Sequence, residues 1–323
     1  MLKNLRLAFP NATLDFLTEF PSKEVVFGNP NVDTVFAFNI KEETGLSLIM
    51  KIRRQRYDLV IDLFGNPRSA IVAYFSGAQH RVGYRFGWRK HCYNILIEPR
   101  GGEVHNIDFN LDALKAINVP VIDRSPYFPR SDDAKEFAGD FFRKEHLDGT
   151  FVVAINPGGG WYTKRWRAKS YAELGNRLRT EFDASIIITW GPGEEPLAEE
   201  IRSLMGGNAT LIPKSTLKQL GAILEQCSLM VTNDSGPMHI AAVLGTPIAA
   251  IYGPTHPELQ GPATDKSVIV RKEDLSCLGC NLTECPIGNP CMEGLEVDVV
   301  LGAVRKLIER LHLHEKIIQS AMH

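Results

Sequence analysis

The second half of the chain alternates short apolar runs with longer segments whose apolar residues recur every three or four positions. Runs without polar alternation are typical of strands in a parallel sheet that is covered on both faces. The longer segments have the spacing of amphipathic helices. This alternation predicts a doubly wound α/β domain. The predicted strands are 151–155, 185–190, 229–233, 248–252 and 268–270, and the predicted helices are 168–182, 195–205 and 216–227.

The first half repeats this pattern with shorter runs. Segment 2–10 has the character of the end of a helix and leads at once into an apolar run. A doubly wound domain normally begins with a strand, and the turn after that strand often carries a binding loop. The N-terminal domain is therefore expected to lack its first strand. The predicted strands are 13–17, 34–38, 58–65 and 81–84, and 69–77 is predicted to be helical.

Composition limits the class of protein further. The chain has 323 residues, more than one hydrophobic core usually serves, so two domains are expected. The net charge of −2 argues against a general nucleic-acid-binding surface. No apolar run approaches the ~20 residues of a membrane-spanning helix, and the N-terminus lacks the pattern of a signal peptide. A cytoplasmic protein with reduced cysteines is expected.

One polar turn opens a helix in the second half. Asp234, Ser235 and Gly236 come directly after the predicted strand 229–233 and before an apolar helix. The unpaired backbone N–H groups of a helix start bind anions, and the helix dipole assists them. The alternative is that Asp234 or Ser235 only caps the helix.

Two other turns carry charged residues. The triple glycine 158–160 is followed by Lys164 and Arg165, and the strand 185–190 is followed by Glu194 and Glu195. Cations suit phosphate, and a carboxylate accepts hydrogen bonds from ribose hydroxyls. Each feature also has an ordinary explanation, a solvated basic pair in one turn and acids favoured by the helix dipole in the other. Because parallel strands end at one edge of a sheet, the three turns together fit a nucleotide diphosphate.

These motifs resemble those of the bacterial heptosyltransferases, the ADP-heptose:lipopolysaccharide enzymes of glycosyltransferase family 9. The resemblance rests on the block 232–254, on "NPGGGWYTKRW" and "WGPGEE", on the late cysteine cluster with its Cys-Pro, and on "YDLVIDLFGNPRSAIVAYFSGAQHRVGY" and "HNIDFNLDALKAINV" in the first half. It covers nearly the whole chain. It implies a GT-B fold, in which two Rossmann-like domains face each other across a cleft.

The resemblance also implies how the chain is divided. Residues 1–125 would form the acceptor-binding N-terminal domain, incomplete at its start, and residues 150–295 the nucleotide-sugar-binding domain. Residues 126–149 are expected to form a linker, because prolines precede and enter this stretch. The amphipathic helix expected within 296–323 would pack back on the N-terminal domain.

Residue roles on the donor side follow from position in the family motif. Lys164 would hold the donor diphosphate, and Ser235 and Gly236 would contact phosphate from the helix start. Asp234 would face the sugar. Glu194, in preference to its neighbour, would bind the ribose.

Three residues outside these turns match family segments as well. His239 follows Ser235 by one helical turn and would either contact the donor site or serve in helix packing. Arg68 and His105 would face the acceptor, with ordinary exposed loop positions as the alternative.

The general base proposed for the family is an aspartate in a Gly-Asp turn that would lie upstream of Met1. Either Met1 is an internal methionine taken as the start, or the chain is a natural truncation. A misplaced start is favoured, because loss of a central strand leaves buried backbone groups unpaired. In the chain as written Asp62 is the nearest substitute base, although an aspartate there also suits a turn cap.

Four cysteines near the end have the ligand number of a structural zinc or iron–sulfur site: Cys277, Cys280, Cys285 and Cys291. The second pair is spaced unlike a zinc ribbon. Reduced thiols that pack a loop, or a disulfide, are the alternatives.

The sequence therefore predicts an inverting glycosyltransferase that moves heptose from ADP-heptose to the lipopolysaccharide inner core, either Kdo-lipid A or a heptosylated core. No cofactor is expected for catalysis, and no nucleic acid as a partner. A peripheral contact with the inner membrane would suit a lipid-borne acceptor. The alternatives are a family 9 transferase with another nucleotide sugar, a non-catalytic nucleotide-sugar binder, and a four-cysteine metal or redox protein.

Overall fold

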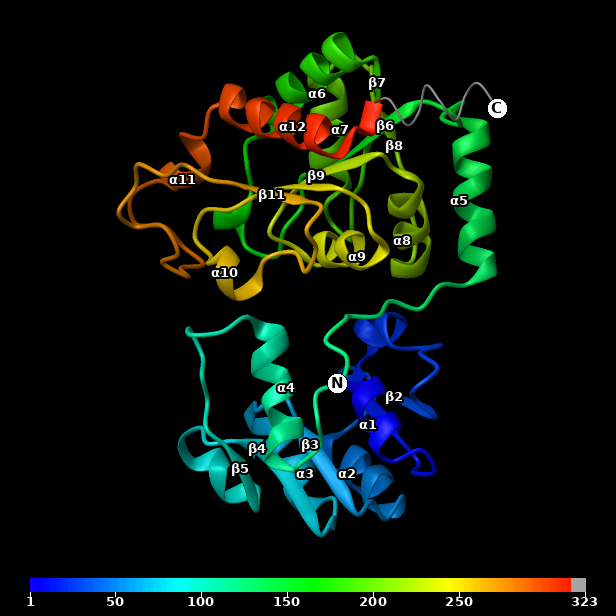
Figure 1. Ribbon diagram of the computed structural model, residues 1–323, viewed down its shortest axis with the longest axis vertical. Coiled ribbons are helices and arrows are strands. Elements are labelled where there is room, and N and C mark those ends of the chain that lie inside the picture. Colours follow the sequence, from blue (N-terminus) through cyan, green and yellow to red (C-terminus); the bar gives the residue numbers. More distant parts are fainter. Residues whose placement is uncertain (315–323) are drawn as a thin grey trace. The chain divides into compact units, whose positions relative to one another are not determined.

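A computed structural model describes residues 1–314 of the chain. It divides into two compact units, Met1–Pro129 and a second unit that begins at Arg130 (Figure 1). No helix among residues 1–314 is long and apolar enough to cross a membrane.

The second unit is built on one sheet of six parallel strands in the order β11-β10-β9-β6-β7-β8. Counted within the unit, this is 6-5-4-1-2-3, the strand order of doubly wound dinucleotide-binding domains. The predicted doubly wound domain is confirmed. The strands are β6 (Phe151–Asn156), β7 (Ala184–Ile188), β8 (Thr210–Leu211), β9 (Leu229–Asn233), β10 (Ile248–Ile251) and β11 (Ser267–Val270).

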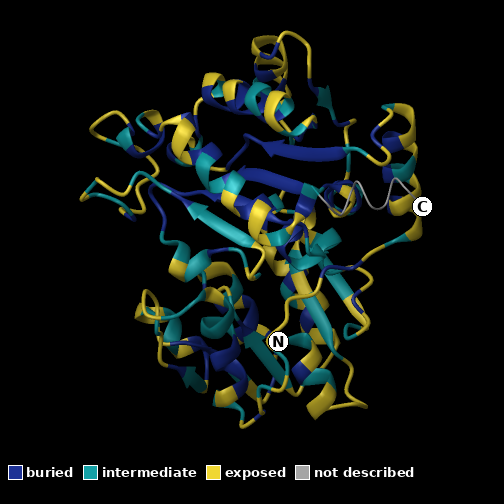
Figure 2. Ribbon diagram, turned by 45° about the horizontal axis from the view of Figure 1, so that its top comes forward, coloured by how far each residue is buried: buried dark blue, intermediate teal, exposed yellow. Residues whose placement is uncertain are grey.

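Helices cover both faces of this sheet, which explains why its strands are apolar throughout. Every residue of β6 is buried, and Figure 2 shows the central strands in the colour of buried residues. Val153 and Ile155 pack with α6, α7 and α12, whereas Val152 and Ala154 pack with α5, α8 and α9. The helices of the unit are α5 (Asp132–Lys144), α6 (Ala168–Phe182), α7 (Glu195–Leu204), α8 (Leu217–Gln226), α9 (Gly236–Leu244), α10 (Pro257–Gln260), α11 (Pro290–Glu293) and α12 (Val297–Leu311), with a 3₁₀ helix at Tyr162–Lys164.

The expected linker 126–149 is wrong over most of its length, because it contains α5. Ser131 caps this helix by accepting the backbone N–H of Ala134. Ala138, Phe141 and Phe142 share the buried face that packs on α8. The prolines before residue 130 concealed a helix whose apolar spacing begins only after the cap.

The C-terminal helix belongs to the core of the second unit, and the expectation that it also packs back on the N-terminal domain stays a prediction. α12 packs on α6, β10 and β11 of its own unit, because Val300, Val304 and Leu307 enter the core there. The helix ends at Leu311, and His312, its C-cap residue, adopts a left-handed conformation. Residues 315–319 of the predicted helix lie outside the described residues.

The first unit has two smaller parallel sheets, β1-β2 and β3-β4-β5. Their strands are mostly half-buried, and their cores are four separate clusters. The elements are α1 (Leu2–Ala8), β1 (Asp15–Glu19), β2 (Thr34–Phe38), α2 (Gly45–Arg54), β3 (Leu59–Asp62), α3 (Pro67–Phe75), β4 (His80–Tyr84), β5 (Ile95–Ile97) and α4 (Asn106–Ala116), with 3₁₀ helices at Phe20–Val25 and Gly87–Cys92.

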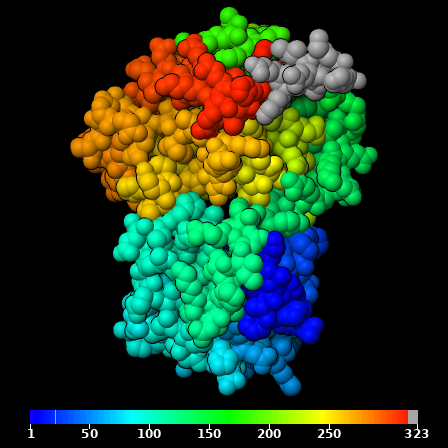
Figure 3. Space-filling view, viewed as in Figure 1, coloured from blue at the N-terminus to red at the C-terminus, as the bar shows by residue number. Residues whose placement is uncertain are grey.

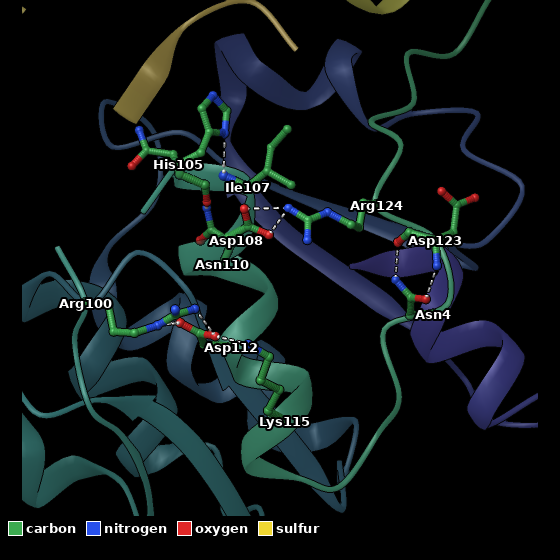
Figure 4. Close-up of polar contacts among 11 residues, drawn as sticks. Asn4, Arg100, His105, Ile107, Asp108, Asn110, Asp112, Lys115, Asp123 and Arg124 are labelled. Carbon is green, nitrogen blue, oxygen red and sulfur yellow. Dashed lines mark hydrogen bonds and ion pairs between the residues drawn. The ribbon is translucent and has the colours of Figure 1, made fainter. Parts of the chain in front are cut away.

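Charged side chains fasten α4 to its surroundings in the first unit (Figure 4). The carboxylate of Asp112 accepts two hydrogen bonds from Arg100, of 2.8 and 2.6 Å, and one of 2.8 Å from Lys115. Asp108 pairs with Arg124 one turn earlier on the helix. Asp112 is only 8% exposed, and its two partner cations compensate for the loss of water around it.

A buried amide ties α1 to the chain segment after α4. Asn4, 1% exposed, accepts the backbone N–H groups of Ile122 and Asp123, each at 2.9 Å, and donates to the Asp123 carbonyl at 2.6 Å. The side chain thereby provides hydrogen-bond partners for backbone groups of a segment that pairs with no strand among the described residues.

Candidate functional site

The carboxyl edge of the six-stranded sheet brings the predicted donor turns together. The strand order reverses between β6 and β9, which lie side by side in register from Val153 with Leu229 to Asn156 with Thr232. Ligands of doubly wound domains bind outside the strand ends at this switch point. The turn after β6 leads to Lys164, and the turn after β9 is Asp234–Gly236.

A fully buried amide joins these two turns. Asn233 ends β9; its Oδ1 accepts the Tyr171 hydroxyl at 2.8 Å and the Trp166 backbone N–H at 3.2 Å. Its Nδ2 donates to the carbonyls of Pro157 and Gly158, at 2.8 and 3.2 Å. Burial raises the pKa of Tyr171 well above its ordinary value, so the phenol keeps the proton that it donates. All four hydrogen-bonding positions of the amide are filled, and the β6 turn is held against β9.

A second amide, Asn156 at the end of β6, connects three strand ends. Its Nδ2 donates to the hydroxyls of Thr232 and Ser235, at 2.9 and 3.0 Å, and its Oδ1 accepts from Thr189 at 2.9 Å. Ser235 is the N-cap residue of α9, but its side chain makes no capping hydrogen bond. The hydroxyl is held by the sheet, so the capping alternative does not describe Ser235.

Asp234, which is buried, and Lys164, which is partly buried, form an ion pair at the same edge. The Lys164 ammonium lies 2.7 Å from Asp234 Oδ2, with side-chain exposures of 15% and 5%. Thr255 and Gln260 donate to the same oxygen at 2.8 and 3.3 Å. Lys164 also lies 4.5 Å from the centre of the Trp161 ring. Three donors and an aromatic face therefore hold one cation and one anion in a fixed place beside the start of α9.

The start of α9 is open to an approaching group. Gly236 is exposed, and a Cβ atom built on it would have no heavy atom within 4 Å. Pro237, at the first turn, removes no hydrogen bond that the helix needs. Gly236, in the first turn of a nine-residue helix, is thus open to solvent, and Asp234, two residues before it, pairs with Lys164. A helix start offers backbone N–H groups that have no partner within the helix.

Glu194 clamps two glycine turns together. Its Oε1 accepts the backbone N–H of Gly159 at 3.1 Å, and its Oε2 accepts that of Gly191 at 3.0 Å. A Cβ atom on Gly158 would lie 2.3 Å from Glu194 Oε2, so a side chain at this position would displace the carboxylate. The neighbouring Glu195 is exposed and begins α7. The preference for Glu194 as ribose ligand stays a prediction, and its carboxylate has a structural task as well.

The remaining predicted site residues are His239, one helical turn after Ser235, and Arg68 and His105 of the first unit; their roles at the site stay predictions. His239 is on α9 and is exposed. In the first unit, Arg68 pairs with Glu19 at 3.1 Å. The ring of His105 accepts the Ile107 backbone N–H at 3.2 Å and caps α4 (Figure 4). His105 therefore has the role of a helix cap, and its acceptor role stays a prediction.

Asp62, the substitute base, is buried and engaged on both carboxylate oxygens. One oxygen accepts the backbone N–H groups of Phe64 and Gly65, at 3.1 and 2.9 Å, and the other accepts the Tyr93 hydroxyl at 2.7 Å. Burial and the hydrogen bond to Asp62 raise the pKa of Tyr93, so this hydroxyl stays protonated. This geometry is that of a turn cap.

The cysteine segment lies against the site turns. The backbone N–H groups of Gly279 and Asn281 donate to the carbonyls of Gly253 and Pro254, and Thr163 donates to the carbonyl of Leu282. Burial raises the pKa of Cys291 to about 11, with a smaller contribution from the other three thiols of the segment. Within residues 1–314 no three His, Cys, Asp or Glu side chains are placed to hold a metal ion, and the cysteines there are free thiols.

Sequence reasoning missed four residues of the site: Asn156, Asn233, Thr255 and Gln260. The two asparagines carried a signal, because Asn156 is the polar last residue of an otherwise apolar strand and Asn233 ends a strand that begins with three apolar residues. Thr255 and Gln260 carried none, since their contact with Asp234 depends on how the chain after β10 returns.

Comparison with known proteins gives the chain relatives over most of its length. Residues 46–290 match the model of glycosyltransferase family 9 (heptosyltransferase). The chain is 27% identical over 298 residues to lipooligosaccharide heptosyltransferase 2 of Haemophilus influenzae, a match that covers 84% of this chain and 83% of that protein.

Two solved structures share the fold. A family 9 glycosyltransferase from Veillonella parvula superimposes with a TM-score of 0.83 at 21% identity, covering 96% of this chain and 92% of the other. The ADP-heptose lipopolysaccharide heptosyltransferase II of E. coli gives a TM-score of 0.74 at 21% identity, with coverages of 96% and 94%. The predicted GT-B fold is confirmed.

Proposed function

The chain belongs to glycosyltransferase family 9, and from that premise we propose that it transfers heptose from ADP-heptose to the inner core of lipopolysaccharide. The observation that carries the proposal is the Lys164–Asp234 ion pair beside the open start of α9, at the switch point of the sheet. The H. influenzae relative named for heptosyl transfer matches this chain over more than four fifths of its length.

The proposed reaction is a displacement with inversion. An acceptor hydroxyl attacks the anomeric carbon of the heptose, the bond from that carbon to the phosphate oxygen breaks, and ADP leaves. Negative charge grows on the departing diphosphate. The α9 N–H groups and the Lys164 ammonium are fixed before the reaction, so they stabilise this charge without reorganising.

In this proposal Asp234 has two roles: it positions Lys164 for the diphosphate, and it faces the sugar. Its Oδ2 holds Lys164, Thr255 and Gln260, and thereby keeps the ammonium beside the helix start. The same carboxylate would face the sugar of the donor. Glu194 would accept ribose hydroxyls while it clamps the glycine turns.

The acceptor is proposed to be lipid-borne, a Kdo-lipid A or a core that already carries heptose. An enzyme acting on it would work at the inner face of the inner membrane as a peripheral protein. Arg68, exposed at the first turn of α3, is the proposed cation for acceptor phosphate or carboxylate groups.

Calorimetric titration with ADP tests the donor site. Lys164→Ala is expected to weaken ADP binding by at least about tenfold, because a charge-assisted contact to phosphate is lost. Lys169→Ala, five residues further on, is the matched control and should bind ADP as the parent does. Since Lys164→Ala strands the buried Asp234, the double variant Lys164→Ala/Asp234→Ala restores charge balance and should bind as weakly. ADP binding that survives in both variants would refute the donor-site assignment.

A panel of nucleotide sugars tests the sugar and the base. Transfer is expected from ADP-heptose and not from UDP- or GDP-sugars. If the protein binds the donor but transfers heptose to no core acceptor, it is a nucleotide-sugar-binding protein and the proposed transferase activity is wrong.

A further inference from the structure

Helix α3 presents an apolar face to solvent. Of its buried residues, Ala70 and Ala73 pack with the β3-β4-β5 sheet, and Val72 packs with α2 and β2. Ile71, Tyr74 and Phe75 recur at intervals of three and four on the other side of the helix. Their exposures are 39%, 50% and 48%. A surface helix normally carries polar residues on that side, and Arg68 is the single charged residue of α3. Contiguous exposed apolar side chains of this kind mark an interaction surface.

Arginines surround the C-terminal end of α3. The amino ends of β3 and β4 share one edge of their parallel sheet, so the segments that lead into these strands lie together. Arg53 Nη1 donates to the Phe75 carbonyl at 3.2 Å, and the Arg81 guanidinium lies 5.9 Å from the centre of the Tyr74 ring. Tyr74 and Phe75 are themselves in edge-to-face contact at 5.1 Å.

Two further arginines extend this surface. Arg54 ends α2, which packs beside α3, and Arg56 follows in the link to β3; both are exposed. Asp58 is the acidic residue of the same link. We call this surface the amino-edge patch: Arg53, Arg54, Arg56, Tyr74, Phe75 and Arg81. In Figure 3 the chain of α2 and α3, coloured in the lighter blues, reaches the surface at the bottom of the first unit.

The chemistry of the patch fits an anionic lipid surface. Tyrosine and phenylalanine side chains partition into the boundary between headgroups and acyl chains, and arginines beside them pair with lipid phosphates. The first unit, Met1–Pro129, holds sixteen Lys and Arg against thirteen Asp and Glu, whereas the rest of the chain holds twenty against twenty-five. We propose that the amino-edge patch docks the first unit on an anionic bilayer.

The direction of α3 suits an amphiphilic acceptor, and in this respect the inference rests on the proposed function. The helix begins beside Arg68 at the carboxyl edge of its sheet and ends at Phe75 on the amino edge. Its nine residues span about 13 Å. One helix therefore offers a cation to the sugar end of a lipid-anchored saccharide and an aromatic pair to the membrane that holds it.

Vesicle co-sedimentation tests the docking. The protein is expected to bind vesicles of equal parts phosphatidylglycerol and phosphatidylethanolamine, and to leave vesicles of phosphatidylcholine unbound. Tyr74→Ser/Phe75→Ser and Arg54→Glu/Arg56→Glu should each weaken this binding at least about tenfold. The first pair loses apolar surface that enters the bilayer boundary, and in the second pair each basic residue near an anionic surface contributes roughly a fivefold factor. Both pairs are exposed, so thermal melting should show that the variants fold.

A matched control uses the basic side of α12, another amphipathic helix that faces solvent. Val299→Ser/Lys306→Glu changes an exposed apolar and an exposed basic residue there, and vesicle binding should be unchanged. The proposal is overturned if the parent does not bind anionic vesicles, if the patch variants bind as the parent does, or if the α12 variant loses as much.

Two further readouts distinguish docking on lipid from self-association and from a defect in the donor site. If sedimentation without lipid shows a dimer that the patch variants dissolve, the patch binds a second copy of the chain and the docking proposal is wrong. ADP titration of the patch variants should match the parent. Vesicle binding that survives where ADP binding is absent would refute the donor site alone, and the converse result would refute the docking alone.

Discussion

The two units are built from the same alternation of strand and helix, but they bury their strands differently. In the second unit helices cover both faces of a six-stranded sheet, and β6 and β9 are buried at every position. In the first unit two short sheets keep half-buried strands over small separate cores. A buried amide that makes no hydrogen bond lowers the stability of the fold. A polar residue at the end of a buried strand, such as Asn156 or Asn233, is therefore expected to have hydrogen-bond partners.

The units differ in charge as well. The second unit concentrates its candidate chemistry in a small buried constellation at one sheet edge, although it carries an excess of acidic residues overall. The first unit carries an excess of basic residues spread over exposed positions. Binding strength in the second unit therefore depends on burial and geometry, and attraction in the first depends on long-range charge, which salt screens.

The largest expected effect tests the difference in burial. Ile155→Ala, in fully buried β6, should lower the stability of the second unit by about 3 kcal/mol, because a cavity opens between sheet and helices. Val60→Ala, in half-buried β3, should cost the first unit about 1 kcal/mol. Native-state hydrogen exchange reads the two units separately. Equal losses in both would mean that the units share their stability in spite of their different cores.

A smaller effect is expected from a single methyl group at the site. Gly158→Ala would place its Cβ against the Glu194 carboxylate, release the clamp on Gly159 and Gly191, and weaken ADP binding by about tenfold, or about 1.4 kcal/mol. Gly160→Ala is the matched control, because a Cβ there meets no heavy atom within 4 Å. The same titration measures both variants. If they behave alike, Glu194 is not the clamp that fixes the turns.

The smallest effect concerns the charges around α4. Asp112→Asn should lower the stability of the first unit by about 1 kcal/mol at neutral pH, since Arg100 and Lys115 keep part of their hydration. Burial raises the pKa of Asp112, but hydrogen bonds from Lys115 and Arg100 outweigh it, and the pKa is lower than usual.

The sign of the pH dependence follows from that lowered pKa. The advantage of Asp112 over asparagine is present above the unfolded pKa of about 3.9 and is lost as the pH falls through the lower folded value. Urea titrations of both proteins across the acid range measure this loss. A gap in stability that persists after the carboxyl group is protonated would show that the ion pairs are not its cause.

The sequence predicted the second unit closely for a physical reason. Strands 151–155 and 229–233 and helix 168–182 stand where the apolar pattern places them. The strands are buried on both faces and therefore begin as unbroken apolar runs, and the helix keeps the three-to-four-residue spacing of its one buried face. β5 and β8 were missed, since three and two residues are too short to show a period. α5 was missed because the prolines before it indicated a linker.

The site was predictable to the level of residue type and turn. Lys164, Asp234 and Gly236 do meet at one edge, as parallel strand ends must. The ion pair between Lys164 and Asp234 was not predictable, because sequence spacing does not show which side chains meet. The hydrogen bonds that Thr255 and Gln260 donate to Asp234 were not predictable for the same reason. The role of His105 as the N-cap of α4 was also not predictable, because a histidine in a loop carries no sequence pattern that indicates a helix cap.

The register of β6 with β9 also has a consequence for biosynthesis. The bond from Asn156 to Thr232 spans 76 residues of sequence. At ribosomal speeds of roughly 5–20 residues per second, β6 waits about 4–15 s for the strand that completes its second edge. Throughout that interval a wholly buried strand has one unpaired side, which is the kind of intermediate that aggregates or recruits chaperones. The adjacency that creates the site at the centre of the sheet thus makes the nascent chain vulnerable until β9 has been made.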